Sequence, residues 1–170
     1  MKNALCLVAA TGIILISVGC EKDKNTSDFT LRVTINGNQW TSVKDSSFSQ
    51  SIQRGLLPYE VKIVGSGNII SRLEVNLPTI LGSFPITMSF GDSSLAPSIW
   101  LRMNGKDYLN NFNTGSLTIK SMGVALNGDH SAEGTFEVVL YNAQDVLDSV
   151  VLQDGKFNVE GGILEPVLWF

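Results

Sequence analysis

The chain contains only two cysteines, Cys6 and Cys20, and both lie within the first twenty of its 170 residues. The rest of the sequence therefore has no thiol for a disulfide, a cysteine metal site or a cysteine nucleophile. Histidine is equally scarce, since His130 is the single one. Imidazole titrates near neutrality and often serves as a base or metal ligand, so the sequence offers little material for either role.

Positive charge is also in short supply. Lys and Arg together number 12 against 16 Asp and Glu, which gives a formal net charge of −4. Proteins that bind nucleic acids neutralise phosphates with a basic patch, and no basic run is present here. We therefore expect no nucleic-acid partner.

Motifs that carry catalysis are missing as well. The sequence has no Gly-x-Ser-x-Gly elbow and no glycine loop of the kind that cradles phosphates. His130 follows Asp129 in a turn-like segment, and an exposed turn histidine is the favoured interpretation over a general base. Glycosidases need two carboxylates facing the scissile bond, but Glu74 and Glu137 fall on the polar faces of expected strands, where they should be solvated. We predict no catalytic residue, and a hydrolase is the least favoured hypothesis.

Three aspartates, Asp145, Asp148 and Asp154, gather near one expected hairpin. Calcium prefers oxygen ligands of this kind. Their spacing does not fit an EF-hand loop, so ordinary loop acids are the favoured interpretation. We expect no metal site and no cofactor.

The first segment with a clear signal is the apolar run 4–17, which follows Lys2 without a charge. It is short for a membrane-spanning helix but has the length of a signal-peptide core. Its end, Ser17-Val18-Gly19-Cys20, resembles the lipobox of lipoprotein signal peptides, although Ser17 stands where leucine is commonest. We predict that residues 1–19 are a lipoprotein signal peptide and that Cys20 is lipidated with palmitate or similar acyl chains.

Residues 20–27 would then form the lipidated cysteine and a short tether. Residues 21–27 contain no apolar side chain, so a flexible spacer is expected. Several acyl chains, at about 0.8 kcal/mol per buried methylene, hold a protein stably on a membrane. The predicted location is the cell envelope, where the protein would be lipid-anchored at the outer membrane. The sequence does not distinguish the cell-surface face of that membrane from its periplasmic face.

Residues 28–170 are predicted to form a single β domain. Leu31, Val33 and Ile35 alternate with polar residues, as in a strand with one buried face, and Asn36-Gly37 is typical of a hairpin turn. Further strand segments are expected at 59–64, 70–77, 98–103, 117–120, 135–141 and 149–159, and turns at 65–68, 104–107, 127–129 and 154–156.

Many short strands with regular turns are typical of an all-β, antiparallel β-sandwich, which is the fold class we predict. A closed, lipocalin-like β-barrel is the alternative. The serine-rich segment 42–53 is either a long loop or an edge strand. Residues 142–147 are the only stretch with a plausible helical pattern.

Several of these segments resemble an uncharacterised family of small lipoproteins from the Bacteroidetes group. The resemblance rests on the strand, Asn-Gly turn and tryptophan of 29–40, on Gly82-Ser83-Phe84-Pro85-Ile86, and on the segments 115–119, 134–138 and 151–157. It implies a secreted β-sandwich-like domain. The family brings no established activity or binding residues.

Aromatic side chains give the best indication of ligand recognition. Trp40, Trp100, Tyr108 and Trp169 are the candidate ligand contacts, because exposed rings on one face could stack on sugars, although burial in the core is the competing interpretation. The leading hypothesis is a membrane-anchored, non-catalytic binding or adhesion domain for a glycan or another envelope protein. The alternative is a structural or accessory envelope lipoprotein without a small-molecule ligand.

Overall fold

The computed structural model describes residues 30–43, 48–54, 57–80, 82–91, 96–125 and 129–161. Within these ranges the regular structure is entirely β, and no helix there is long and apolar enough to cross a membrane. The strands are β1 (Thr30–Ile35), β2 (Asn38–Thr41), β3 (Phe48–Arg54), β4 (Leu57–Gly65), β5 (Ile70–Pro78), β6 (Ile86–Ser89), β7 (Ser98–Met103), β8 (Lys106–Val124), β9 (His130–Asn142) and β10 (Ser149–Gly161).

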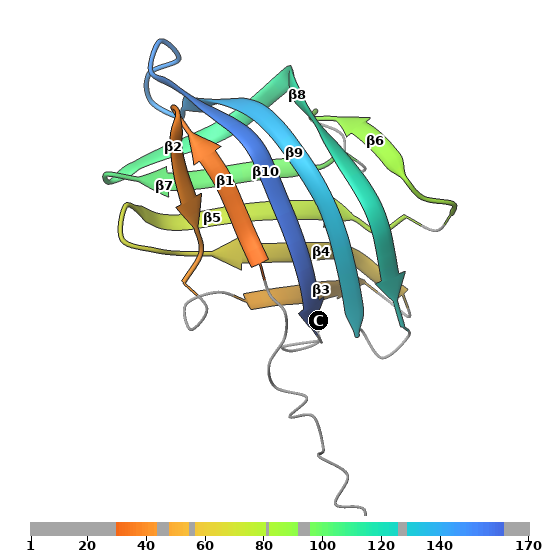
Figure 1. Cartoon of the computed structure of the whole chain (residues 1–170). Helices are drawn as coiled ribbons and strands as arrows, with labels where there is room; N and C mark the ends of the chain where they lie inside the picture. Colours follow the sequence, from red (N-terminus) through yellow and green to blue (C-terminus); the bar gives the residue numbers. More distant parts are fainter. Residues whose placement is uncertain are drawn as a thin grey trace, which may run out of the picture.

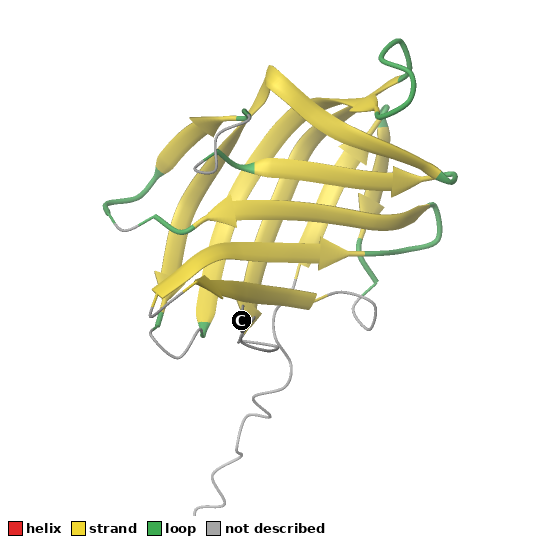
Figure 2. Ribbon diagram, turned by 180° about the vertical axis from the view of Figure 1, so that it is seen from behind, coloured by secondary structure: helices red, strands yellow, loops and turns green. Residues whose placement is uncertain are grey.

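All of these strands belong to one antiparallel sheet, in the order β2-β1-β10-β9-β8-β7-β5-β4-β3, with β6 paired to β8 outside this order. The sheet is strongly curled. One side is formed by β2, β1, β10, β9 and the second half of β8, and the strands β7, β5, β4 and β3 run across behind it (Figures 1 and 2). The prediction of an all-β, antiparallel fold is confirmed.

Strand β8 connects the two sides of the curled sheet. Its first residues pair with β7 and its later ones pair with β6 along the same edge, while β9 follows its other edge. The register against β9 shifts between Asn110 and Gly115. A side chain at position 115 would collide with the backbone of Glu137 and Val138. Glycine therefore lets β9 approach β8 closely where β8 changes direction.

The core lies between the two sides and follows from the period-two pattern of the strands. In β9 buried and more exposed residues alternate along the whole strand. Each fully buried aliphatic or phenylalanine side chain contributes about 1.5–3 kcal/mol to folding. Among the side chains with at most 1% exposure are Leu31, Ile63, Leu73, Leu77, Phe90, Ile99, Leu101, Leu117, Ile119, Leu140 and Phe157.

Two phenylalanine rings lie over glycines where β9 pairs with β10. Phe157 is the cross-strand partner of Gly134, and Phe136 is the partner of Gly155. A Cβ at position 155 would come within 2.5 Å of the Phe136 ring, and one at position 134 would collide with Phe157. Glycine positions covered by an aromatic ring are a known means of curving a sheet. These reciprocal pairs therefore fill the core beneath the curved strands β9 and β10 (Figure 1).

The turn predicted at 154–156 is wrong, because these residues lie inside β10. The register of β10 shifts between Leu152 and Gly155 against β9, and a shift at the same place is seen against β1. Asp154 has a φ of 51°. An extra residue accommodated in this way is a β-bulge, which bends and twists a strand without reversing it.

The helical pattern of residues 142–147 is likewise not realised. The segment is an irregular connection in which Asn142 Oδ1 accepts a hydrogen bond from Gln144 N at 2.9 Å, and Asp145 Oδ1 accepts one from Leu147 N at 3.0 Å. Side chains that bond nearby backbone groups compete with helix formation. Of the two interpretations of 42–53, the edge strand is correct for the part that forms β3, because β3 is the last strand in the order. Strand β6 was not predicted from the sequence.

Replacing Gly134 with alanine is expected to lower the free energy of unfolding by about 1–3 kcal/mol, because the added methyl group would collide with the Phe157 ring and with the Thr118 carbonyl oxygen. Urea denaturation followed by tryptophan fluorescence measures this change. The control is Gly82→Ala, which meets nothing within 4 Å and should stay within about 0.5 kcal/mol of the parent. Equal losses for the two variants would contradict the seating of Phe157 on Gly134.

Candidate ligand-binding pocket beside the bulge in β10

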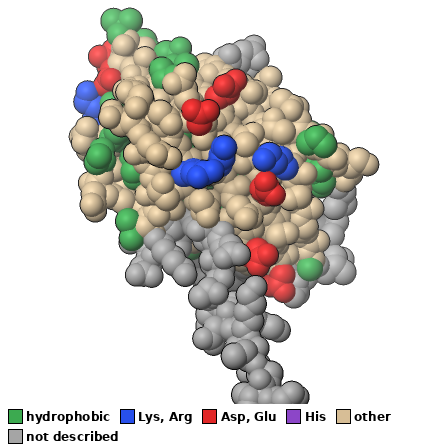
Figure 3. Space-filling model, viewed as in Figure 1, with side chains coloured by type: hydrophobic (Ala, Val, Ile, Leu, Met, Phe, Trp, Pro, Cys, Tyr) green, Lys and Arg blue, Asp and Glu red, His purple; other side chains and the backbone are tan. Residues whose placement is uncertain are grey.

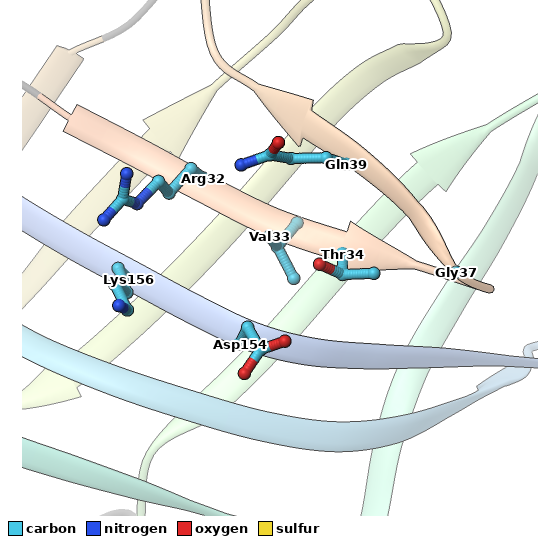
Figure 4. A pocket seen from close by; sticks show the side chains of 7 residues that line it. All are labelled: Arg32, Val33, Thr34, Gly37, Gln39, Asp154 and Lys156. Atoms are coloured by element: carbon cyan, nitrogen blue, oxygen red, sulfur yellow. The ribbon is translucent and has the colours of Figure 1, made fainter.

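A pocket of about 390 Å³ lies on the outer face of β1, β2 and β10, at the bulge. Arg32 pairs with Lys156 and Thr34 pairs with Gln153, so Val33 lies opposite two residues, Asp154 and Gly155. Bulges re-aim side chains and occur often beside functional sites. The pocket is lined by Arg32, Val33, Thr34, Gly37, Gln39, Asp154 and Lys156 (Figure 4).

Asp154 has a backbone conformation that is unusual inside a strand. Among the described non-glycine residues, positive φ values occur at Asn36, Asn104 and Asp154. Asn36 and Asn104 each precede a glycine in a tight turn between two strands, where the left-handed region is expected. Asp tolerates this region better than most residues, but it still costs free energy. Such residues cluster at functional sites, which makes Asp154 a candidate.

Two cations face each other at one end of the pocket. Arg32 and Lys156 are exposed cross-strand partners, and like charges directly opposite each other destabilise a sheet. Within the described part of the chain, neither side chain forms an ion pair. Every other cation whose side chain the structure describes does form one: Lys62, Arg72, Arg102, Lys106 and Lys120.

The other end of the pocket is polar. Thr34 is half-buried, and Gln39 is its exposed partner on β2. In Figure 4 the Arg32 and Lys156 side chains lie toward one end, Thr34 and Asp154 lie toward the other, and the Gln39 side chain extends from β2 alongside β1 in the direction of Arg32. Figure 3 shows basic side chains in the middle of this face, with acidic ones on both sides of them. The pocket thus combines cationic donors with neutral hydrogen-bonding groups and one carboxylate.

The aromatic residues proposed as ligand contacts do not form one exposed platform. Trp40 is 8% exposed and Tyr108 is 4% exposed, and both belong to the core. They are buried because they occupy inward-facing positions on β2 and β8. Trp100 is half-buried on the outer face of β7, with the Arg72 guanidinium 5.6 Å from its ring centroid. Trp169 lies outside the described residues.

Two polar residues are more buried than predicted. His130 is 4% exposed, so the prediction of an exposed turn histidine is wrong. It begins β9 on the same inward face as Ala132, because the strand starts earlier than the turn signal suggested. Glu74 is 9% exposed and forms ion pairs with Arg72 and, at 3.6 Å, with Lys62. Its burial results from these partners, whereas Glu137 is exposed as predicted.

Asp148 organises a separate polar cluster at the connection between β9 and β10. Its carboxylate accepts hydrogen bonds from Lys106 Nζ at 2.7 Å, Asn142 Nδ2 at 3.0 Å and the Tyr108 hydroxyl at 3.2 Å. The Lys106 ammonium group lowers the pKa of Asp148, and the same contact raises the pKa of Lys106. Burial raises the pKa of Tyr108. These contacts hold the 143–148 connection against the β7–β8 hairpin.

Asp145, Asp148 and Asp154 do not converge on one point. Asp145 bonds the backbone of its own loop, Asp148 belongs to the cluster with Lys106, and Asp154 lies at the bulge of β10. Among the described residues, no group of three or more His, Cys, Asp or Glu side chains is placed to hold a metal ion.

The comparisons with known proteins give no precedent for this pocket. No family model matches the chain, and no match is found among curated proteins or among solved structures. The role of the pocket therefore has to be inferred from its own residues.

Sequence reasoning missed Arg32, Asp154 and Lys156 as site residues. One signal was present, because Asp154-Gly155-Lys156 interrupts an otherwise alternating segment, 149–159. A lone glycine inside a strand pattern often marks a bulge. The pairing of Arg32 with Lys156 could not be predicted from the sequence, because it depends on the register between strands that are far apart in the chain.

Replacing Asp148 with asparagine is expected to reduce stability at neutral pH. The pKa of Asp148 in the folded protein lies below its ordinary value of 3.8, so its contribution is present above that value and is lost as the pH falls through the folded-state pKa. Urea denaturation at about pH 7 and about pH 3 should show a smaller difference from the parent in acid.

Asp145→Asn is the matched control for this measurement. Its remaining amide oxygen can still accept the hydrogen bond from Leu147 N, so its effect should be small and similar at both pH values. A deficit of Asp148→Asn that does not change with pH would contradict the assigned pKa direction.

Proposed function

We propose that the protein is an envelope lipoprotein whose β domain is a non-catalytic binding or adhesion module. Residues 1–19 are the signal peptide, Cys20 is the lipidated residue and 20–27 form the tether. All of these lie outside the described residues. Support for the anchor comes from the apolar run 4–17, the Ser17-Val18-Gly19-Cys20 motif and the polar segment after it. Membership of the Bacteroidetes-group lipoprotein family belongs to the same proposal.

The binding role is carried by one observation, the adjacent unneutralised cations Arg32 and Lys156 in the pocket at the bulge. Their mutual repulsion opposes folding, and the left-handed conformation of Asp154 adds about 1–3 kcal/mol of strain. The bulge in β10 accounts for the conformation of Asp154, whereas a sheet face with a purely structural role gains nothing from two facing cations. A ligand that bridges the two cations would offset their repulsion. The proposed partner is a glycan or another envelope protein, which the domain would meet at the outer membrane. The same proposal includes no nucleic-acid partner, no cofactor and no catalytic residue.

A structural or accessory role without a small-molecule ligand is the second candidate. It is favoured by the burial of Trp40 and Tyr108, which removes two of the four aromatic candidates from any external contact. Under this hypothesis the pocket would have no specific occupant.

For the finer fold class we infer an antiparallel β-sandwich formed by the two sides of the curled sheet. Support comes from the strand order, which has β2 and β3 at its ends with no ladder joining them in the described ranges. Ser49 Oγ of β3 donates a hydrogen bond to the Glu160 carbonyl of β10 at 3.3 Å, a side-chain contact that joins the two sides without a ladder. The closed, lipocalin-like barrel would require a continuous ladder there.

Replacing Cys20 with alanine is expected to abolish palmitate labelling, leave the leader uncleaved and prevent lipid anchoring. The reason is that acylation of this thiol both anchors the chain and precedes cleavage. Metabolic labelling of cells and fractionation of their membranes measure both effects. Cys6→Ala is the matched control and should label and process as the parent does. Labelled, processed Cys20→Ala protein would contradict the proposed anchor.

A photo-crosslinking residue in place of Gln39, at the rim of the pocket, is expected to give a discrete adduct in intact cells. The same residue in place of exposed Ser131, at the start of β9 and outside the pocket lining, is the control and should give none. Adducts of equal yield at both positions, or none at Gln39, would favour the structural role.

A further inference from the structure

We infer that the pocket beside the bulge binds a carboxylate-bearing sugar, such as a uronic acid unit of an acidic glycan. Arg32 and Lys156 would hold the carboxylate, and Thr34, Gln39 and Asp154 would bind the hydroxyl groups. This inference rests on the proposed binding role and specifies its ligand class.

The cationic end of the pocket matches a single carboxylate. A guanidinium group is planar and binds a carboxylate through two parallel hydrogen bonds, while an ammonium group adds a point charge. Arg32 and Lys156 are cross-strand partners, so their Cβ atoms stand about 4.5–5.5 Å apart. One carboxylate can therefore contact both side chains, and it replaces their mutual repulsion with two attractive contacts.

The polar end of the pocket matches neutral hydroxyl groups. The Asp154 carboxylate can only accept hydrogen bonds, whereas the Thr34 hydroxyl and the Gln39 amide can both accept and donate them. A sugar hydroxyl needs partners of both kinds. No described aromatic ring lines this pocket, so recognition would depend on hydrogen bonds and charge.

The acidic groups near the bulge argue against a phosphate as the ligand. Asp154 lines the pocket, and exposed Glu137 follows Phe136, the β9 partner of Gly155. A phosphate monoester carries about −1.5 to −2 charges near neutrality and would be repelled by both carboxylates. A uronic acid carries one negative charge, which it can direct toward Arg32 and Lys156.

The shape of the pocket favours a unit within a longer chain. Arg32, Gln39, Asp154 and Lys156 are all exposed, so the pocket is an open depression with little enclosure. Open sites bury less of a ligand than enclosed pockets do, and several units on one polymer raise the overall affinity through effective concentration. Binding is therefore expected to be weak for one sugar and stronger for an acidic polysaccharide.

The test is isothermal titration calorimetry on the full mature lipoprotein in detergent micelles. The probes are trigalacturonate, the uncharged galactotriose and inorganic phosphate. Trigalacturonate is expected to bind at least about tenfold more tightly than galactotriose, because its carboxylate forms charge-assisted hydrogen bonds, which are roughly twice as strong as neutral ones. Phosphate is expected to bind more weakly than trigalacturonate.

Substitutions in the pocket test which side chains contact the sugar. Arg32→Gln and Lys156→Gln should each weaken trigalacturonate binding by about tenfold or more, without loss of thermal stability, since each removes a like-charge contact. Lys120→Gln is the matched control, because Lys120 is a surface cation already paired with Glu133 at 3.3 Å, and it should change binding by less than about twofold. Asp154→Asn tolerates the same backbone conformation and should improve phosphate binding.

Each contrary result has a defined meaning. Equal binding of galactotriose and trigalacturonate, tighter binding of phosphate, or no binding of trigalacturonate would overturn the acidic-sugar assignment. Unchanged binding by Arg32→Gln and Lys156→Gln would overturn the assigned site. The crosslink at Gln39 and the labelling of Cys20 test the proposed function independently, so the ligand class can fail while the binding role stands.

Discussion

The structure depends on the way β9 and β10 pack their phenylalanines onto each other's glycines. Phe157 covers Gly134 and Phe136 covers Gly155, so the rings occupy space that any side chain at those positions would take. The two strands can then bend together while the core beneath them stays filled. The change of direction within β8 then carries the strands β7, β5, β4 and β3 across the opposite side of the same core (Figure 2).

The same region generates the candidate pocket. Gly155 is held in the core by its contact with Phe136, and Asp154 immediately before it has a positive φ within the bulge. The bulge changes the register between β1 and β10 and places the exposed Arg32–Lys156 pair in the same pocket as the Asp154 carboxylate. The core contact on one face of β10 and the charged pocket on the other are therefore two consequences of one irregularity in the strand.

Elsewhere on the described surface, several charged side chains have partners of opposite charge within the protein. Glu74 is shielded between Arg72 and Lys62, and Asp148 is held by Lys106, Asn142 and Tyr108. Those carboxylates have cationic partners within the protein and stabilise the fold locally. Arg32 and Lys156 stand apart from this pattern, which moves the expected recognition site from the tryptophans to a polar pocket. An acidic glycan would supply the missing negative charge.

The sequence by itself determined the β class, because side chains alternate between the faces of a strand and that period is visible in residues 29–35, 70–77 and 149–159. It also predicted the leader, the lipidated cysteine and the tether, which stay predictions. Only the tertiary structure decided that 106–124 is one continuous strand, that His130 and Glu74 are buried, and that Asp154 lies in a bulge and not in a turn. Strand register and burial depend on pairings between segments distant in the chain, and Arg32 meets Lys156 only through such a pairing.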